Sequence, residues 1–388
     1  MRPVSIIGIG ETKMGKLVDR SLRDLILEAG EKAIKDAGIE RSAIQALYVG
    51  NFIGQPLTGQ GHMGSMVSEV LQLGNIPSVR TEGACASGSL ALRMGMAAIQ
   101  AGWYDVVLVG GAEKMTHQPT PKITDAIASA MDYEMEALQG FTFPANFAMI
   151  ANRYFYEHRN VKREMAQCAV NAHANASLNP DAQMGKLIDL DKALNAAMIA
   201  DPLGLFDCSL TTDGAAFVVL AATDVANAIC PKERIVDVIG TGHAGNTVSL
   251  FSKPVITSFA ATKIAAKQAY EQAGLTPDDI DFAEVHDCFT ITQIINTEDL
   301  GFFEAGHGGD AVAEGKTARD GSKPINVSGG LKAKGHPIGA TGLSQIYEVV
   351  TQLRGEAGER QLKKAEIGLA HSLGGTAGTC VINILKGR

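Results

Sequence analysis

Two distant segments of the chain have the same pattern and align without a gap. Residues 29–51 read AGEKAIKDAGIERSAIQALYVGN, and residues 265–287 read AAKQAYEQAGLTPDDIDFAEVHD. Each segment predicts an amphipathic helix that ends at a glycine, Gly38 or Gly274, followed by a short turn and a strand. An internal repeat of this length indicates a duplicated fold, because each copy is one helix–strand unit that must bury its apolar face.

The similarity continues on both sides of these segments. Each copy follows a strand that ends in Gly-x-Gly, IIGIG at 6–10 and VIGTG at 238–242. Further along, DVVLVGGAE at 105–113 matches EIGLAHSLG at 366–374, and both predict a strand that leads into glycines. Alternating strands and helices predict an α/β fold of stacked layers in which helices cover the sheets.

The repeat also sets the expected domain boundaries. The N-terminal half comprises residues 1–112 and 208–231, and the C-terminal half comprises residues 232–388. Between them, residues 113–207 form an insertion that contains MDYEMEALQGFTFPANFAMIANRYFYEH, a segment rich in methionine and aromatic residues. We interpret these apolar side chains chiefly as core packing, and the functional alternative is a lid over a hydrophobic acyl group. The run AAFVVLAA then predicts a buried strand that returns to the first half.

Composition and charge exclude several classes of function. The chain has 388 residues, a net charge of −8 and no run of five basic residues, which argues against a nucleic-acid partner. No apolar stretch reaches the roughly 18 residues of a membrane span, and the N-terminus predicts a strand, not a signal peptide. The six cysteines are scattered without a CxxC pair, which predicts reduced thiols in the cytoplasm and argues against structural zinc.

One cysteine, Cys85, stands among small residues in TEGACASGSLAL, directly before a predicted helix. The repeat pairs it with His336 in KGHPIGATG, and a pseudo-twofold axis would bring these two points together. A helix N-terminus and a neighbouring imidazole favour a thiolate. Small neighbours leave room for a bulky thioester and free N–H groups for an oxyanion. These features predict a nucleophilic cysteine in preference to a small buried apolar residue.

The motif EVHDCFT places His286 and Cys288 two residues apart at the end of a predicted strand, where both would face the same side. They would serve either as metal ligands or in acid–base chemistry, with the imidazole polarising a carbonyl and the thiol moving a proton. No further ligand pair at a suitable spacing is present, so we favour acid–base chemistry. Asp287 would face the other way, and we interpret it as structural.

The motif HSLGGTAGT, at 371–379, supplies further candidate residues. Its backbone amides are suited to an oxyanion hole, whereas His371 fits the core and the site equally well. The GIGETKMG segment near the N-terminus lacks the spacing of a dinucleotide-binding motif, and no P-loop occurs. The residues expected near an acyl pocket are Met115, Phe141, Phe143 and Phe147.

At these motifs the sequence resembles the thiolase superfamily, over essentially its whole length. EGACASGS resembles the nucleophile motif, and KGHPIGATG closely matches the GHP motif. HDCF resembles the variant of sterol-carrier-protein-type and archaeal-type thiolases, where conventional thiolases have NEAF. Conventional thiolases carry an acid/base cysteine in a C-terminal CxG motif, but AHSLGGTAG contains no cysteine here. The resemblance therefore assigns that role to Cys288.

The resemblance implies a duplicated, layered fold with an inserted lid domain, and an acyltransferase that uses CoA thioesters without a bound cofactor or metal. It implies that Cys85 is acylated in a ping-pong reaction, that His336 activates it, and that both histidines bind the enolate oxygen. The amides of Cys85, Gly374 and Gly375 would bind the tetrahedral intermediate. Either acetyl-CoA is condensed to acetoacetyl-CoA, or a 3-oxoacyl-CoA is cleaved by CoA.

Two alternatives stay open. A decarboxylating condensing enzyme of the ketoacyl-synthase type would use Cys85, His286 and His336 without a base, but Cys288 and the GHP motif favour a thiolase. A non-catalytic acyl-CoA-binding subunit is disfavoured by the intact Cys85–His336 pair. Family likeness further implies a homodimer or tetramer, and likeness to the subgroup implies a small zinc-ribbon/OB-fold partner protein.

Overall fold

The computed structural model describes residues 2–388, and its centre is one mixed sheet of nine strands. The strands of the N-terminal half, from the centre outward, are β1 (Val4–Glu11), β7 (Gly214–Ala222), β4 (Val106–Glu113), β2 (Ala46–Gly50) and β3 (Ser78–Thr81). The strands of the C-terminal half, in the corresponding order, are β8 (Val236–Gly245), β11 (Thr379–Lys386), β10 (Ile367–Gly374) and β9 (Phe282–Glu284). The halves join where Ser5 and Ile6 of β1 pair with β8.

The two halves of the sheet have the same topology. In each half the three inner strands are antiparallel to their neighbours, and the fourth strand joins in parallel, as β2 on β4 and β9 on β10. In the place that corresponds to β3, the C-terminal half has a single parallel bridge between Ala283 and Ile325. The duplicated α/β fold that the repeat predicts is therefore confirmed.

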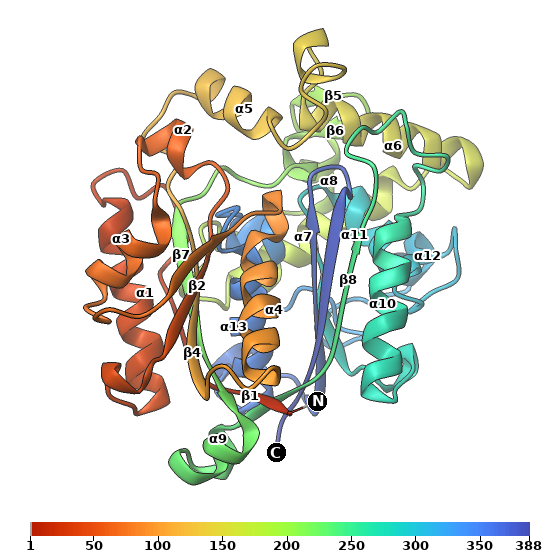
Figure 1. Ribbon diagram of the computed structural model, residues 1–388. Helices are drawn as coiled ribbons and strands as arrows, with labels where there is room; N and C mark the ends of the chain where they lie inside the picture. Colours follow the sequence, from red (N-terminus) through yellow and green to blue (C-terminus); the bar gives the residue numbers. More distant parts are fainter. Residues whose placement is uncertain (1) are drawn as a thin grey trace.

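Helices separate and cover the two halves of the sheet, as Figure 1 shows. The helices of the duplicated part are α1 (Leu22–Ala37), α2 (Gly54–Thr58), α3 (Met63–Val70), α4 (Ser87–Gln100), α9 (Thr223–Ile229), α10 (Ala260–Ala273), α11 (Thr290–Asp299), α12 (Gly308–Ala313) and α13 (Thr341–Leu353). α4 and α13 lie between the sheet halves, with α1 outside one half and α10 outside the other (Figure 1). The layers thus alternate as helix, sheet, helix, sheet, helix.

The repeated helices end as the sequence predicts. α1 stops at Gly38 and α10 at Gly274, with φ angles of 65° and 67°, and this left-handed conformation favours glycine. A buried apolar cluster then binds the central layer to both halves of the sheet. It includes Leu92 of α4 and Leu343 of α13, together with strand residues from each half.

Part of the insertion lies over one end of the layers, and Figure 1 places its helices Thr120–Ala128 and Phe143–Glu157 at the top. Its elements are α5 (Thr120–Ala128), α6 (Phe143–Glu157), α7 (Lys162–Ala176), α8 (Leu190–Leu194), β5 (Met198–Ala200) and β6 (Leu203–Gly204). Phe147 and Tyr154 of α6 are fully buried and pack in one cluster with α10 and α11. This part of the methionine- and aromatic-rich segment is therefore core.

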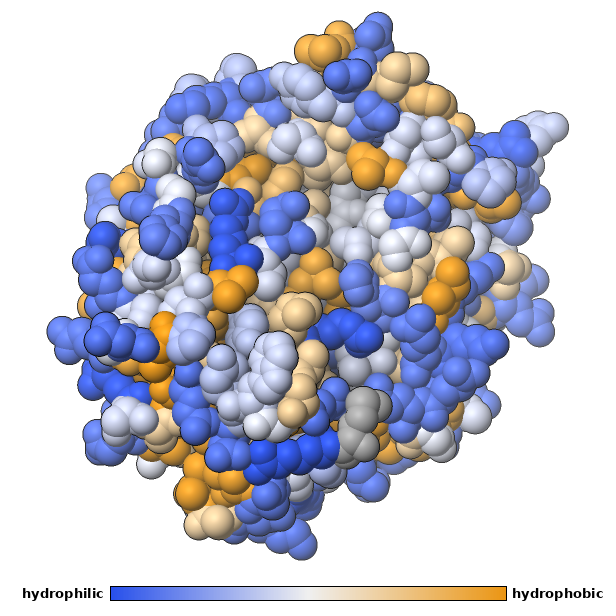
Figure 2. Space-filling view, viewed as in Figure 1, coloured by the Kyte–Doolittle hydropathy of each residue, from blue (hydrophilic) through white to orange (hydrophobic). Residues whose placement is uncertain are grey.

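None of the helices over residues 2–388 combines the length and the apolar character needed to cross a membrane. The face of the molecule in Figure 2 is mostly hydrophilic, and its hydrophobic side chains lie in small separate groups.

The N-terminal ends of α4 and α13 touch through backbone atoms. A Cβ atom on Gly342 would lie 2.0 Å from the Oγ of Ser89 and 2.7 Å from its backbone nitrogen. A Cβ atom on Gly88 would lie 2.9 Å from the carbonyl oxygen of Gly339. Because glycines line this contact, the segments that precede the two helices lie next to each other.

We expect Gly342→Ala to lower the free energy of unfolding by about 1–3 kcal/mol, because the added methyl group meets the backbone of α4. In an ordinary helix the same change is stabilising. Gly61→Ala is the control, since the nearest atom to its Cβ is 4.0 Å away. Chemical denaturation of both variants measures the difference, and equal stabilities would contradict the close contact.

Candidate active site

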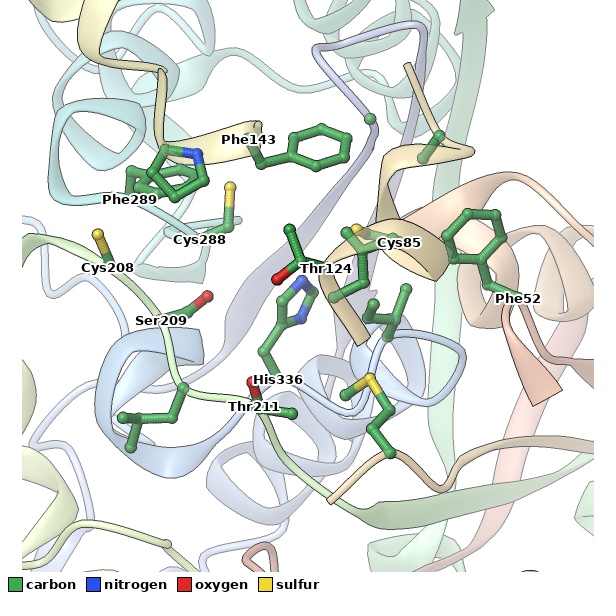
Figure 3. A pocket seen from close by; sticks show the side chains of 17 residues that line it. Phe52, Cys85, Thr124, Phe143, Cys208, Ser209, Thr211, Cys288, Phe289 and His336 are labelled. Carbon is green, nitrogen blue, oxygen red and sulfur yellow. The ribbon is translucent and has the colours of Figure 1, made fainter. Parts of the chain in front are cut away.

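A cavity lies where the segments that precede α4 and α13 face the insertion (Figure 3). Its volume is about 190 Å³. Both halves and the insertion line it, through Phe52, Cys85, Met115, Thr124, Ile127, Phe143, Cys208, Ser209, Thr211, Cys288, Phe289, His336, Ile338 and Gly375, among others. The predicted nucleophile, its predicted base and the second thiol therefore share one mostly apolar chamber.

Cys85 sits in a one-turn helix, Ala84–Ala86, directly before α4. Ala84 has a φ of 49°, a left-handed conformation that costs on the order of 1–3 kcal/mol for a residue with a side chain. The Ser87 hydroxyl holds the turn, since its Oγ donates to the Ala84 carbonyl at 2.6 Å and accepts from the Gly83 N–H at 3.0 Å. The chain thus uses local strain to aim the thiol into the cavity.

The backbone N–H groups of Gly375 and of Cys85 itself both act to lower the pKa of the Cys85 thiol. Gly375 has a φ of 61°, and a Cβ there would lie 2.4 Å from the Ala130 carbonyl oxygen, so the turn requires glycine. These two N–H groups are the donors predicted for an oxyanion hole. Gly374 instead packs against the nucleophile turn, where its Cβ would lie 2.3 Å from the Gly83 carbonyl oxygen.

Burial raises the pKa of the Cys85 thiol to about 12, despite the two N–H groups. Burial therefore outweighs the helix N-terminus in the resting site, where Cys85 is a neutral thiol. Glu113 and Glu82 contribute to the rise because their negative charges disfavour a second anion. The thiol has to pass its proton to a base during the reaction.

His336 has the geometry of that base. Its Nδ1 lies 2.7 Å from the Thr341 Oγ1, and this hydroxyl donates to the Pro337 carbonyl at 3.1 Å. Because the hydroxyl proton is used there, the Nδ1–H of His336 donates to Thr341, and Nε2 keeps a free lone pair. Burial lowers the pKa of His336 to about 3, so the resting imidazole is neutral.

His286 lies beside His336, with ring centroids 5.2 Å apart and the rings nearly perpendicular. Three atoms lie within 4.8 Å of one another: one ring nitrogen of His286, one ring nitrogen of His336 and the sulfur of Cys85. The carbonyl of His286 accepts hydrogen bonds from Thr292 Oγ1 at 3.0 Å and Asn296 Nδ2 at 2.8 Å, both on α11. These bonds fix the backbone that carries the ring.

His286 and Cys288 are not on a strand, because β9 ends at Glu284. They lie in the loop between β9 and α11, so the two-residue strand periodicity that placed them on one side does not apply. Cys288 lines the cavity, and burial, with Cys85 and Asp287 close by, raises its thiol pKa well above the ordinary value. Asp287 accepts a hydrogen bond from the Leu331 N–H at 2.7 Å, which agrees with a structural role.

His371 is fully buried outside the cavity lining. Its Nδ1 accepts from the backbone N–H of His286 at 3.3 Å, so its proton is on Nε2, which lies 3.1 Å from the Thr262 hydroxyl. Of the two interpretations left open by the sequence, the structure shows the core position, from which His371 holds the His286 backbone.

The four residues expected near the acyl pocket are divided. Met115 and Phe143 line the cavity. Phe147 lies behind it, stacked on Phe289 with ring centroids 4.6 Å apart, and Phe141 is exposed beside a different hollow. Phe141 and Phe147 therefore do not line the cavity: Phe141 precedes α6, and Phe147 lies on a face of α6 that packs against Phe289.

Asp213, which directly precedes β7, organises one wall of the cavity. Its Oδ1 accepts from the N–H groups of Met115 at 2.6 Å and Thr116 at 2.8 Å, and its Oδ2 pairs with the Lys114 ammonium at 2.6 Å. Burial alone would raise the pKa of Asp213, but the hydrogen bonds from Lys114 and Thr116 outweigh it and keep the pKa below the ordinary value.

Glu113 is a second organising residue that the sequence did not reveal. Its Oε2 accepts from the N–H groups of Phe52 and Gly339, both at 3.0 Å, and its Oε1 accepts from the Asn51 amide at 2.9 Å. Burial raises its pKa to about 7. This carboxyl group ties a cavity wall of the first half to the loop that carries His336.

Comparison with known proteins agrees with this architecture. Residues 4–224 match the model of the thiolase N-terminal domain, and residues 242–387 match that of the thiolase C-terminal domain-like family. The chain belongs to the thiolase family. The family, and its class of enzyme, an acyltransferase, are those predicted from the sequence.

Individual relatives support the thiolase assignment over the full length. The chain is 48% identical to an acetyl-CoA acetyltransferase of Methanothermobacter thermautotrophicus, with 100% of both chains covered. It is 34% identical to bovine sterol carrier protein 2, over 99% of this chain and 72% of that protein. Among solved structures, the Ltp2–ChsH2(DUF35) aldolase has a TM-score of 0.86 at 26% identity, covering 99% of this chain and 98% of that one. The Acat5 thiolase of Ascaris suum in complex with coenzyme A shares the fold, with a TM-score of 0.74, 20% identity and complete coverage of both chains.

Thr341→Val should slow acylation of Cys85 by about 10- to 100-fold, because His336 loses the acceptor that keeps the proton on Nδ1. Thr341→Ser retains the hydroxyl and should stay near the parent rate. Rapid-quench measurement of acylation with acetyl-CoA provides the comparison. An unchanged rate in a folded Thr341→Val protein would contradict the assigned tautomer.

Asp213→Asn should lower the free energy of unfolding by about 3–5 kcal/mol, because it leaves the buried Lys114 ammonium without its counter-charge. Asp224→Asn is the control, since its ion pair with Arg2 is exposed and screened by solvent. Urea denaturation of both variants tests this difference, and equal effects would refute the role of Asp213.

Proposed function

We propose that this thiolase transfers acyl groups between CoA thioesters through an acyl-Cys85 intermediate. It would condense acetyl-CoA to acetoacetyl-CoA, or cleave a 3-oxoacyl-CoA with CoA. The observation that carries the proposal is that the Cys85 thiol lies within 4.8 Å of two neutral imidazoles, those of His286 and His336, and shares one cavity with a second thiol, Cys288. The names of the acetyl-CoA acetyltransferase relatives support the choice of acetyl-CoA.

In the first half-reaction, the Nε2 of His336 takes the Cys85 proton as the sulfur attacks the thioester carbonyl. The negative charge that develops on the carbonyl oxygen is bound by the N–H groups of Cys85 and Gly375. Such donors are worth about 3 kcal/mol each in other acyl transfers. The CoA thiolate leaves with the proton of Cys288, so that acyl-Cys85, a protonated His336 and a Cys288 thiolate result.

In the second half-reaction, the Cys288 thiolate removes a proton from the methyl group of a second acetyl-CoA. The enolate oxygen accepts two hydrogen bonds, one from an N–H group of protonated His336 and one from the Nε2–H of His286. This tautomer of His286 leaves only an unpaired acceptor at its buried Nδ1, which costs less than an unpaired N–H. The enolate carbon attacks acyl-Cys85, and the released sulfur recovers its proton from His336, while Cys288 holds the proton taken from carbon.

The apolar walls serve the same chemistry. Met115, Phe143 and Phe289 face the thiols and limit the access of water, which would hydrolyse the acyl-enzyme or quench the enolate. The removal of water also strengthens each hydrogen bond to the developing negative charge.

The assembly of the protein is proposed on separate grounds. β3 is an edge strand with the Val79 side chain 50% exposed, which suits pairing with a second copy in a homodimer. The solved aldolase with 26% identity is a complex with a DUF35 protein, and this supports a partner protein for the present chain. The unpaired state of all six cysteines suits a cytoplasmic location.

The roles of Cys85 and Cys288 can be distinguished by measuring two reactions. Exchange of labelled CoA with acetyl-CoA reports the first half-reaction, and acetoacetyl-CoA formation or cleavage reports both. Cys288→Ala should lower the carbon–carbon reaction by at least about 100-fold, through the loss of the acid–base group, while exchange still occurs. Cys85→Ala should lose both reactions, and Cys230→Ala, outside the cavity, should lose neither.

The proposed function would be contradicted if the parent chain, alone and with a partner protein added, catalysed neither CoA exchange nor the carbon–carbon reaction. Release of CO₂ from a malonyl thioester, with no reaction of acetyl-CoA, would identify the decarboxylating alternative instead.

A further inference from the structure

Cys85, His286 and His336 form a compact set of soft and borderline metal donors. One sulfur and two ring nitrogens lie within 4.8 Å of one another, and no other group of three potential ligands this close occurs among residues 2–388. The sequence spacing suggested His286 and Cys288 as a possible ligand pair, whereas the fold brings His286 next to Cys85 and His336, which come from two other segments.

The donor set fits zinc. Zn²⁺ binds one or more cysteine sulfurs at about 2.3 Å and histidine nitrogens at about 2.0–2.1 Å in a tetrahedron, and open sites use three protein ligands and a water. Ligand atoms in such a tetrahedron are roughly 3.3–3.6 Å apart. The three donors, which lie within 4.8 Å of one another, therefore need to close by at most about 1.2–1.5 Å.

The surroundings already orient the ligands. A zinc-bound histidine normally donates its other N–H to a neighbouring acceptor, which fixes the ring and its tautomer. His336 does so through Thr341, at 2.7 Å, and its free Nε2 lone pair is the one available to a metal. The backbone bonds of His286 to α11 and to His371 hold the second ligand in place.

We propose that Cys85, His286 and His336 form a zinc site that, when filled, blocks the nucleophile. Zn²⁺ binds the Cys85 sulfur as a thiolate, and the thiol proton passes to solvent. His336 binds through its free Nε2 lone pair, the ring proton of His286 moves from Nε2 to Nδ1 so that its Nε2 lone pair is also free, and a water completes the tetrahedron. Cys85 is partly exposed and lines the cavity, so the ion reaches the site by the same path as a thioester.

The inhibitory consequence rests on the proposed function, but metal binding does not. While zinc holds the sulfur, the charge of the ion lowers the nucleophilicity of the Cys85 thiolate, and the ion occupies the space that the thioester carbonyl would enter. Conversely, an acyl group on Cys85 removes the thiolate ligand. Zinc and the acyl group therefore exclude each other.

The binding step is tested without substrate, by titrating the purified chain with Co²⁺ as a spectroscopic probe for zinc. We expect one ion per chain and a thiolate-to-cobalt charge-transfer band, which Zn²⁺ then removes. Cys85→Ser and His336→Ala should both lose the band. Cys230→Ser is the matched control and should keep it, because that cysteine lies outside the cavity.

A second measurement uses the parent protein alone. Stoichiometric Zn²⁺ should slow alkylation of Cys85 by iodoacetamide, as mapped by peptide mass spectrometry, and a chelator should restore it. A charge-transfer band that persists in Cys85→Ser, or equal alkylation with and without zinc, would overturn the site. Protection by zinc in a chain that cannot be acylated would uphold the site and refute the proposed function instead.

Discussion

The whole site depends on the contact between the N-terminal ends of α4 and α13. Gly88 and Gly342 let two backbones meet where any side chain would hold them apart. Because α4 and α13 are equivalent elements of a duplicated fold, the residues before them, Cys85 and His336, are brought together. The proposed catalytic pair therefore follows from the packing of the central layer, and no single half of the chain contains it.

Burial explains why the site needs both a base and a set of fixed donors. The apolar chamber that suits an acyl group raises the pKa of the Cys85 thiol and lowers that of His336, so both groups rest in their neutral forms. Charge appears only during the reaction, when the proton moves between adjacent groups and oriented N–H groups are already in place. The same neutral imidazoles and thiol are the forms from which a metal ion displaces a single proton.

Much of this was predictable from the sequence, because the repeat is visible without a structure. It predicts the duplicated fold, the alignment of Cys85 with His336 and the glycines that end α1 and α10. Periodicity failed at His286 and Cys288, since β9 is shorter than its pattern suggests. It could not place Phe147, whose side depends on a tertiary contact with Phe289. Asp213 looks like any turn residue, and burial, which decides the state of the thiol, is not a local property. The three metal donors are scattered along the sequence, so no ligand spacing announces them.

The most direct test of the site is to identify which sulfur carries the acyl group. The protein is mixed with acetyl-CoA, quenched in acid within the first turnover, digested and analysed by peptide mass spectrometry. The structure predicts an acetyl group on the peptide that contains Cys85, and none on the peptide that contains Cys288. Acetylation of Cys288 in its place would contradict the assignment of nucleophile and base, and with it the role given to the α4–α13 contact.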